Sequence, residues 1–245
     1  MTREHLSNAE PDSVRNLRTR RDFLRTAMAG IAASVAAGAA IHSGGEFVHP
    51  QSALAQSTLT PEAALKELMD GNRRFVSGKT TAHEHDLEIL KRHLVEKQEP
   101  FAAVLSCADS RVPVEIIFDQ TIGHIFVNRV AGNILTPEII ASLEYGAAVL
   151  GTKVIMVLGH SDCGAVKAAI AGKPVPGQIS ALYPHLRPAV NQSGPDVKAT
   201  TETNAKIQAK LLSQASTVVT GKIKEGQLKV VGAYYDVGSG AVTLL

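Results

Sequence analysis

The sequence has few of the residue types on which several classes of protein depend. It has no tryptophan, four tyrosines and six phenylalanines, which argues against aromatic platforms that stack nucleic-acid bases. Two cysteines are too few for a disulfide framework, so any role they have is chemical. The 25 basic and 23 acidic residues nearly balance, so the net charge gives no indication of a nucleic-acid surface. Neither a GxGxxG motif nor a P-loop lysine occurs, so nucleotide binding has no support.

The composition is that of a folded, soluble enzyme. The chain has 245 residues, of which 44% are hydrophobic and 20% are charged. This length is sufficient for one large domain or two small ones with a substantial core, and the balance of residues excludes disorder of the whole chain.

Residues 1–55 differ from the rest of the chain. A polar start leads to Arg20-Arg21-x-Phe-Leu, then to an uncharged stretch rich in alanine and glycine over 26–43, and then to Ala-Leu-Ala at 53–55. This order is typical of an export signal, and the paired arginines resemble the twin-arginine class that exports folded proteins. We therefore expect 1–55 to be an export signal and tether, the protein to be periplasmic or otherwise exported, and membrane contact to be transient. A permanent anchor and an arginine-rich amphipathic helix or transit peptide are the alternatives.

The remaining chain, 56–245, alternates between helix and strand patterns. Thr60-Pro61-Glu62 and Thr136-Pro137-Glu138 both combine an N-cap oxygen, a proline in the first turn and an early acidic residue, which indicates two helix starts. The predicted helices cover 60–78, 84–97, 136–150, a segment from 164, 179–190 and 204–220, and the predicted strands cover 101–105, 116–118, 125–127, 154–158, 227–236 and 241–245. Such alternation indicates a mainly parallel α/β sheet, with the last two strands forming a hairpin.

Both cysteines follow predicted buried strands. Cys107 comes just after 101–105, and His160 and Cys163 follow 154–158. Open α/β sheets place ligand sites at such strand ends, and two thiolates with one imidazole suit Zn²⁺ with a fourth position left for water. From spacing alone, two buried thiols that only pack, or a Cys107–Cys163 disulfide, remain alternatives.

The two segments together resemble a known family. Cys-Ala-Asp-Ser-Arg-Val-Pro at 107–113, followed by His-Ser-Asp-Cys-Gly at 160–164, is similar to the paired signature of β-class carbonic anhydrases. The similarity extends to Gly71-Asn72-x-x-Phe75, Phe118-Asp119-Gln120, Phe126-Val127-x-Arg129-x-Ala131-Gly132-Asn133, Glu144-Tyr145 and Gly164-Ala165-Val166. The resemblance implies an α/β fold with a mainly parallel central sheet flanked by helices and an N-terminal helical arm. It also implies that 56–245 is a zinc-dependent catalytic domain.

The resemblance implies roles for five residues. Cys107, His160 and Cys163 would hold one zinc ion per subunit, and the reaction would be reversible hydration of carbon dioxide to bicarbonate and a proton by a zinc-bound hydroxide. Asp109 and Arg111 would form the family's catalytic dyad, in which the guanidinium keeps the carboxylate ionised and oriented. Without the neighbouring cysteine, Asp109 and Arg111 would be interpreted as a surface ion pair.

The resemblance also suggests which residues bind substrate. The offsets of Gln98, Phe126 and Tyr145 from the zinc ligands resemble the plant-type subgroup, in which such residues line the pocket across a dimer interface, and Gly164 adjoins it. Each of the three has a simpler interpretation: a solvent-exposed glutamine, a core phenylalanine and a packed helical tyrosine. The subgroup regulated by non-catalytic bicarbonate has a tryptophan at its regulatory site. Because this chain has none, we expect the always-open form, in which Asp109 does not ligate zinc.

The same resemblance implies a homodimer or a dimer of dimers, with carbon dioxide and bicarbonate as its small-molecule partners. Two other functions remain open at this stage. One is hydrolysis of CS2 or COS on the same fold, and the other is a non-catalytic zinc or redox-sensing protein in which Cys107 and Cys163 oxidise and release the metal.

Overall fold

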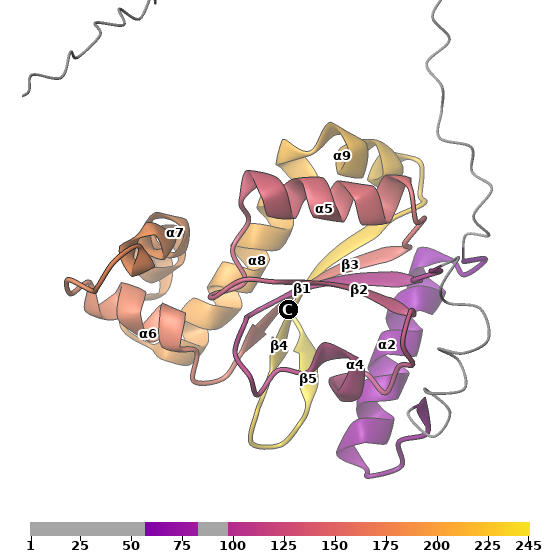
Figure 1. The fold of residues 1–245 in the computed structure, drawn as a ribbon, viewed down its shortest axis with the longest axis horizontal. Coiled ribbons are helices and arrows are strands. Elements are labelled where there is room, and N and C mark those ends of the chain that lie inside the picture. The colour runs from indigo at the N-terminus through magenta and orange to yellow at the C-terminus, as the bar shows by residue number, and fades with distance from the viewer. Residues whose placement is uncertain (1–56, 83–97) are drawn as a thin grey trace, which may run out of the picture. The chain divides into compact units, whose positions relative to one another are not determined.

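The computed structural model describes residues 57–82 and 98–245 (Figure 1). The expected export segment at 1–55 and the helix expected at 84–97 lie outside the described residues. Within the described ranges, no helix is both long enough and apolar enough to cross a membrane.

The elements in chain order are α2 (Pro61–Val76), β1 (Ala102–Ser106), α4 (Val114–Ile117), β2 (Ile125–Arg129), α5 (Pro137–Ala148), β3 (Val154–His160), α6 (Gly164–Ala171), the 3₁₀ helix η2 (Ile179–Leu182), α7 (Tyr183–Ser193), α8 (Val197–Ala215), α9 (Thr217–Lys224), β4 (Lys229–Tyr235) and β5 (Val242–Leu244).

The strands form one mixed sheet in the order β2-β1-β3-β4-β5. Strands β1 to β4 are parallel to their neighbours, and β5 pairs antiparallel with β4 to close the predicted terminal hairpin. Every residue of β1 and β3 is buried, as expected for central parallel strands covered on both faces. The predicted fold class is therefore confirmed.

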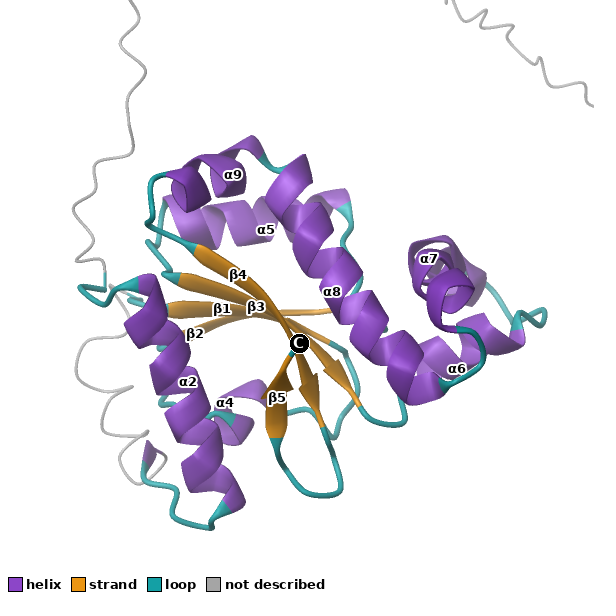
Figure 2. Cartoon of the chain, turned by 180° about the vertical axis from the view of Figure 1, so that it is seen from behind, coloured by secondary structure: helices purple, strands orange, loops and turns teal. Residues whose placement is uncertain are grey.

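Helices cover both faces of the sheet (Figure 2). On one face, Leu68 of α2 and Ile117 of α4 belong to an apolar core with alternate residues of the central strands. On the other, Leu143 of α5 and Leu212 of α8 pack with the remaining strand residues. Burial of these apolar side chains holds the three layers together, at about 25 cal/mol for each Å² removed from water.

The two predicted helix starts are confirmed. Thr60 Oγ1 accepts a hydrogen bond from Ala63 N at 3.2 Å, and Thr136 Oγ1 accepts one from Ile139 N at 3.4 Å. Each bond satisfies one of the amide groups that a first helical turn leaves without a partner. Helix α2 is the part of the expected N-terminal helical arm that the structure describes.

The prediction of a strand at 116–118 is wrong, because this segment belongs to the single helical turn α4 and its C-cap, Phe118. A run of three apolar residues fits a buried strand and a buried helical turn equally well. Here Val114 and Ile117 point into the core while Ile116 is 45% exposed, which is helical rather than alternating burial.

The helix expected near 204–220 is confirmed in part, because the segment is helical but divided into two helices. Helix α8 begins earlier, at Val197, where Asp196 caps it, and Ser216 separates α8 from α9. Ser216 Oγ accepts from Val219 N, so the same residue ends one helix and caps the next. The helix expected at 179–190 is in fact η2 followed by α7.

Candidate metal centre

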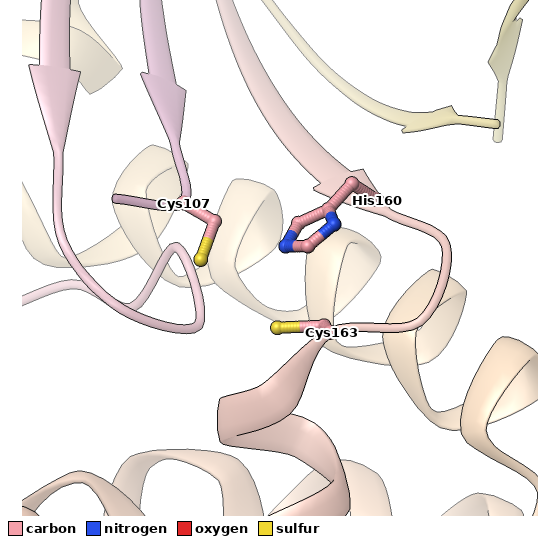
Figure 3. A group of neighbouring side chains, drawn as sticks. All are labelled: Cys107, His160 and Cys163. Carbon is pink, nitrogen blue, oxygen red and sulfur yellow. The ribbon is translucent and has the colours of Figure 1, made fainter. Parts of the chain in front are cut away.

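The sheet brings the three predicted metal ligands together. Cys107 directly follows β1, His160 is the last residue of the adjacent strand β3, and Cys163 is the N-cap of α6. Their donor atoms all lie within 4.8 Å of one another, and all three residues are buried (Figure 3). Because β1 and β3 are parallel neighbours, their carboxyl ends meet at one edge, where open α/β sheets bind ligands.

The donor chemistry fits a metal ion. His160 Nδ1 lies 2.9 Å from the carbonyl oxygen of Ser161, which can only accept, so Nδ1 carries the proton. The lone pair of Nε2 therefore faces the two sulfurs, and this buried atom has no hydrogen-bond partner in the described residues. Metal-bound histidines usually have this arrangement, with the second nitrogen held by a backbone carbonyl.

The two sulfurs interact closely, yet both cysteines are free thiols, so the disulfide alternative does not describe this structure. Hydrogen bonding from Cys163 lowers the pKa of the Cys107 thiol against the opposing effect of burial, with a further contribution from His160. The same contact with Cys107, reinforced by burial, raises the pKa of the Cys163 thiol. The pair therefore favours one thiolate beside one thiol, and a bound dication would favour two thiolates.

Asp109 and Arg111 form a two-pronged ion pair beside the three ligands. Arg111 donates from Nε to Asp109 Oδ1 at 2.9 Å and from Nη2 to Asp109 Oδ2 at 2.8 Å, and its backbone N–H also donates to Oδ1 at 2.9 Å. These hydrogen bonds hold the pKa of Asp109 well below its usual range, so the carboxylate is ionised at neutral pH. Asp109 Oδ2 lies 3.9 Å from His160 Nε2, which places the carboxylate at the metal group.

Two supporting contacts were not predicted. Arg129, the last residue of β2, donates from Nε to the carbonyl of Cys107 at 3.0 Å and from Nη2 to that of Asp109 at 2.5 Å. Gly132 N–H donates to Cys107 Sγ at 3.3 Å. Both residues lie in the segment that resembles the family, but their roles could not be predicted, because the contacts join backbone and side-chain atoms 20 or more residues apart.

The predicted substrate residues fall into two groups. Gly164 begins α6 next to Cys163 and lies at the metal group. Phe126 pairs with Ala103, four residues before Cys107, which corresponds to roughly 13 Å along the strand. Its ring centroid lies 6.2 Å from that of Tyr145, which is 47% exposed on α5.

Gln98 is exposed ahead of the amino end of β1, whereas Cys107 follows the carboxyl end of the same strand. The structure thus brings Asp109, Arg111 and Gly164 to the metal ligands. Within the described part of the chain, it does not bring Gln98, Phe126 or Tyr145 to the ligands of the same subunit.

Comparison with known proteins agrees with this geometry. The sequence profile of the family described as "Carbonic anhydrase" matches residues 102–242. Over 192 residues the chain is 34% identical to carbonic anhydrase 2 of Mycobacterium tuberculosis, covering 75% of this chain and 92% of that protein. It is also 34% identical over 197 residues to the carbonic anhydrase of Mycolicibacterium smegmatis, covering 75% of this chain and 93% of that protein.

Solved structures give the same result. The β-carbonic anhydrase of the fungal pathogen Aspergillus fumigatus aligns with a TM-score of 0.60 and 28% identity, covering 74% of this chain and 90% of that chain. The β-carbonic anhydrase of Coccomyxa, solved with acetazolamide, aligns with a TM-score of 0.58 and 28% identity, covering 74% of this chain and 86% of that chain. Because the family profile covers 102–242, the curated relatives are 34% identical over most of their length and the fold aligns with solved β-carbonic anhydrases, this chain belongs to the β-class carbonic anhydrase family.

Proposed function

We propose that this protein is a zinc-dependent carbonic anhydrase that catalyses the reversible hydration of carbon dioxide to bicarbonate and a proton. The observation that carries the proposal is the convergence of the donor atoms of Cys107, His160 and Cys163 within 4.8 Å, with the ionised Asp109 beside them. These three residues would hold one zinc ion per subunit. When bound, zinc would lower the pKa of a coordinated water toward ~7 and so supply a nucleophile at neutral pH.

Asp109 would orient the nucleophile. An ionised carboxylate can only accept hydrogen bonds, so an oxygen nucleophile beside it must direct a proton toward Asp109 and a lone pair elsewhere, toward the carbon of the substrate. Arg111 would act through Asp109, because its two-pronged contact fixes the carboxylate and keeps it ionised. Both oxygens of Asp109 already bind Arg111, and this supports the open form in which Asp109 does not ligate zinc.

The substrate pocket would be shared between two subunits. The residues of the plant-type pattern, Gln98, Phe126 and Tyr145, lie away from the ligands of their own chain, and Gln98 and Tyr145 are exposed. In a homodimer or a dimer of dimers, these residues would complete the pocket of the neighbouring subunit, with Gln98 donating to a bicarbonate oxygen and Phe126 forming an apolar wall for neutral CO2. A relative from Sordaria macrospora, aligned with a TM-score of 0.60 and 25% identity, is described as tetrameric.

The protein would act after export. The order of charged, apolar and small residues in 1–55 supports a twin-arginine-like signal ahead of a catalytic domain at 56–245, and hence a periplasmic or otherwise exported enzyme. Export in the folded state would suit this site, because zinc would be bound while both thiols are still in a reducing compartment.

Stopped-flow CO2 hydration with zinc quantified in the same sample tests the proposed function. Cys107→Ser should lose most of its zinc and most of its rate, because a hydroxyl is a far poorer zinc ligand than a thiolate. A Cys107→Ser protein that retains zinc and full activity would contradict the assignment. Assays with CS2 and COS on the same samples separate the alternative hydrolase, since turnover of those substrates without CO2 hydration would replace the proposed function.

A further inference from the structure

Two buried amide side chains on α8 are not used by the chemistry proposed above. Asn204 and Gln208 lie one helical turn apart and are only 0% and 2% exposed. The residues beside them on α8, Ala205, Ala209 and Leu212, pack in the apolar core. Burying two uncharged amides in such surroundings is unfavourable unless every polar atom finds a partner.

Each amide atom of the pair has a partner. Asn204 Nδ2 donates to the carbonyl of Gly132 at 2.9 Å, and Asn204 Oδ1 accepts from Gln208 Nε2 at 3.1 Å. Gln208 Nε2 also donates to the carbonyl of His185 on α7 at 3.2 Å, and Gln208 Oε1 accepts from Leu135 N at 3.0 Å. These partners fix the orientation of both amides, because carbonyls can only accept and the Leu135 N–H can only donate.

The pair therefore holds both ends of the segment 132–135, which connects β2 to α5. Gly132 is the point of contact with the metal group, because its N–H donates to Cys107 Sγ at 3.3 Å while its carbonyl is held by Asn204. Its φ of +78° favours glycine, and an added Cβ would lie 3.3 Å from Leu186 and 3.4 Å from Ala165. The absence of a side chain at Gly132 lets the backbone approach Cys107 Sγ. The hydrogen bonds from the Asn204 and Gln208 amides determine where that backbone lies.

We propose that Asn204 and Gln208 are positioning residues for the metal centre, holding the segment 132–135 so that the Gly132 N–H donates to the Cys107 sulfur. The inference rests on the proposed function in that Cys107 must bind the metal. A hydrogen bond to a metal-bound thiolate draws negative charge from the sulfur and so sets how strongly that sulfur donates to the ion. Loss of a hydrogen bond that holds a metal ligand in place typically lowers metal affinity by about 10- to 100-fold.

A purely structural role for the pair leads to different expectations. Loss of buried hydrogen bonds would then lower the stability of the chain but leave the bond between sulfur and metal unchanged. A measurement that reports this bond directly is therefore needed, and Co²⁺ provides one. In place of zinc it gives a thiolate-to-metal charge-transfer absorption that responds to the electron density on sulfur.

The experiment loads the full-length chain with Co²⁺ and records that absorption, and separately follows release of Zn²⁺ from the zinc-loaded chain to a chromophoric chelator. Asn204→Leu keeps the branched shape of the side chain and removes both of its hydrogen bonds. We expect a shifted charge-transfer band and zinc release accelerated about tenfold or more. Gln208→Met, which leaves the Asn204 amide facing Gly132, should shift both readouts in the same direction by less.

Ser213→Ala is the matched control. It removes a hydrogen bond on the same helix, from Ser213 Oγ to the carbonyl of Ala209 at 2.9 Å, rather than one that reaches the segment 132–135. It should leave the band and the zinc release as in the unmodified chain.

A folded Asn204→Leu chain with an unchanged band and unchanged zinc release would overturn the proposal. If this variant does not fold, the Gln208→Met chain decides by the same two readouts. Hydrogen exchange at the Gly132 amide of the unmodified, zinc-loaded chain gives a further test, because exchange as fast as in an open loop contradicts the N–H to sulfur bond. Failure of the proposed function looks different: the unmodified, zinc-loaded chain would then hydrate CO2 no faster than the buffer, even with a thiolate band in its Co²⁺ form.

Discussion

Asp109 differs from an ordinary surface carboxylate because both of its oxygens are held by Arg111. The role proposed for Asp109 depends on its two carboxylate oxygens, and replacing one of them by an amide nitrogen tests that role. Asp109→Asn should keep zinc, because Cys107, His160 and Cys163 are untouched, but should lower kcat by about 10- to 100-fold, since an amide no longer accepts at both positions.

Zinc content and stopped-flow hydration on the same sample measure this effect. Asp162→Asn is the matched control, because it removes an exposed carboxylate between two ligands that pairs with Lys167 rather than Arg111. An Asp109→Asn chain with undiminished kcat, or with its zinc lost, would contradict the role given to Asp109.

Arg129 holds the same loop from the neighbouring strand. Arg129→Met removes both donors to the Cys107 and Asp109 carbonyls, and we expect a loss of about tenfold in kcat or in zinc affinity. Arg129→Lys, which can replace one of the two hydrogen bonds, should lose less. Arg187→Met, the loss of an exposed arginine on α7, should change neither quantity. A lysine variant as active and as tightly zinc-bound as the unmodified chain would contradict this account, because it would show that the charge, rather than the two hydrogen bonds, carries the effect.

The sequence was informative for side chains that act through their own chemistry and silent about backbone atoms. The types and strand-end positions of Cys107, His160 and Cys163 made them candidate ligands, and the resemblance to the family, rather than spacing alone, identified them as the ligand set. The N–H of Gly132 and the carbonyls held by Arg129 carry no residue-specific signal. Their roles depend on how two distant segments approach each other, which only the folded chain shows.

Among the elements, α2 is attached to the domain by a buried carboxylate. Asp119, in the turn after α4, accepts from Arg74 Nε at 2.5 Å and from the backbone N–H groups of Thr81 and Ala82 at 2.9 and 3.0 Å. Burial acts to raise the pKa of Asp119, but these hydrogen bonds outweigh it and the net pKa is lowered. The ionised form therefore stabilises the contact between α2 and the domain.

Asp119→Asn should lower the free energy of unfolding by about 2 kcal/mol at pH 7, since charged hydrogen bonds are replaced by weaker ones. A lowered pKa in the folded state means that the contribution of Asp119 is complete above its unfolded pKa of about 3.9 and is lost as the pH falls through the folded value. The difference between the unmodified chain and Asp119→Asn should thus shrink below pH ~4. Denaturant unfolding at pH 7 and at stepwise lower pH measures it.

Asp70→Asn provides the comparison, because Asp70 pairs with Lys66 and Arg73 on the surface of the same helix, where such pairs contribute less than about 1 kcal/mol. A difference between the unmodified chain and Asp119→Asn that stays constant as the pH falls would contradict the account of the buried carboxylate.

Elements could be predicted where a long buried run or a helix cap marked them, and the prediction failed where a segment was short. The runs at β1 and β3 are long enough to identify as buried strands, and Thr60 and Thr136 mark their helices through their capping oxygens. Residues 116–118 form one turn, too short for periodicity to distinguish helix from strand. Ser216 was missed because it interrupts a helical pattern without a proline or glycine to mark the break.

At the scale of the whole molecule, the proposed function predicts that a second subunit completes the substrate pocket. Tyr145→Arg places a charge on the exposed part of α5 next to Phe126, so we expect it to weaken the dimer and lower the hydration rate while zinc remains bound. Analytical ultracentrifugation, zinc content and stopped-flow kinetics together measure this. Ile179→Arg is the matched control, because Ile179 is also 47% exposed and lies on η2.

A Tyr145→Arg chain that sediments as a monomer and keeps the full rate would show that each subunit has a complete pocket. In that case Gln98, Phe126 and Tyr145 would have no part in substrate binding across an interface.

The central claim is that a zinc ion held by Cys107, His160 and Cys163 makes this chain a carbonic anhydrase. Titration of zinc into the metal-free chain, with CO2 hydration followed by stopped flow at each addition, tests it most directly. The rate should rise in proportion to bound zinc and level off at one ion per chain, as expected for a single three-ligand site. A chain that binds one zinc ion through these residues and hydrates CO2 no faster than the buffer would contradict the claim.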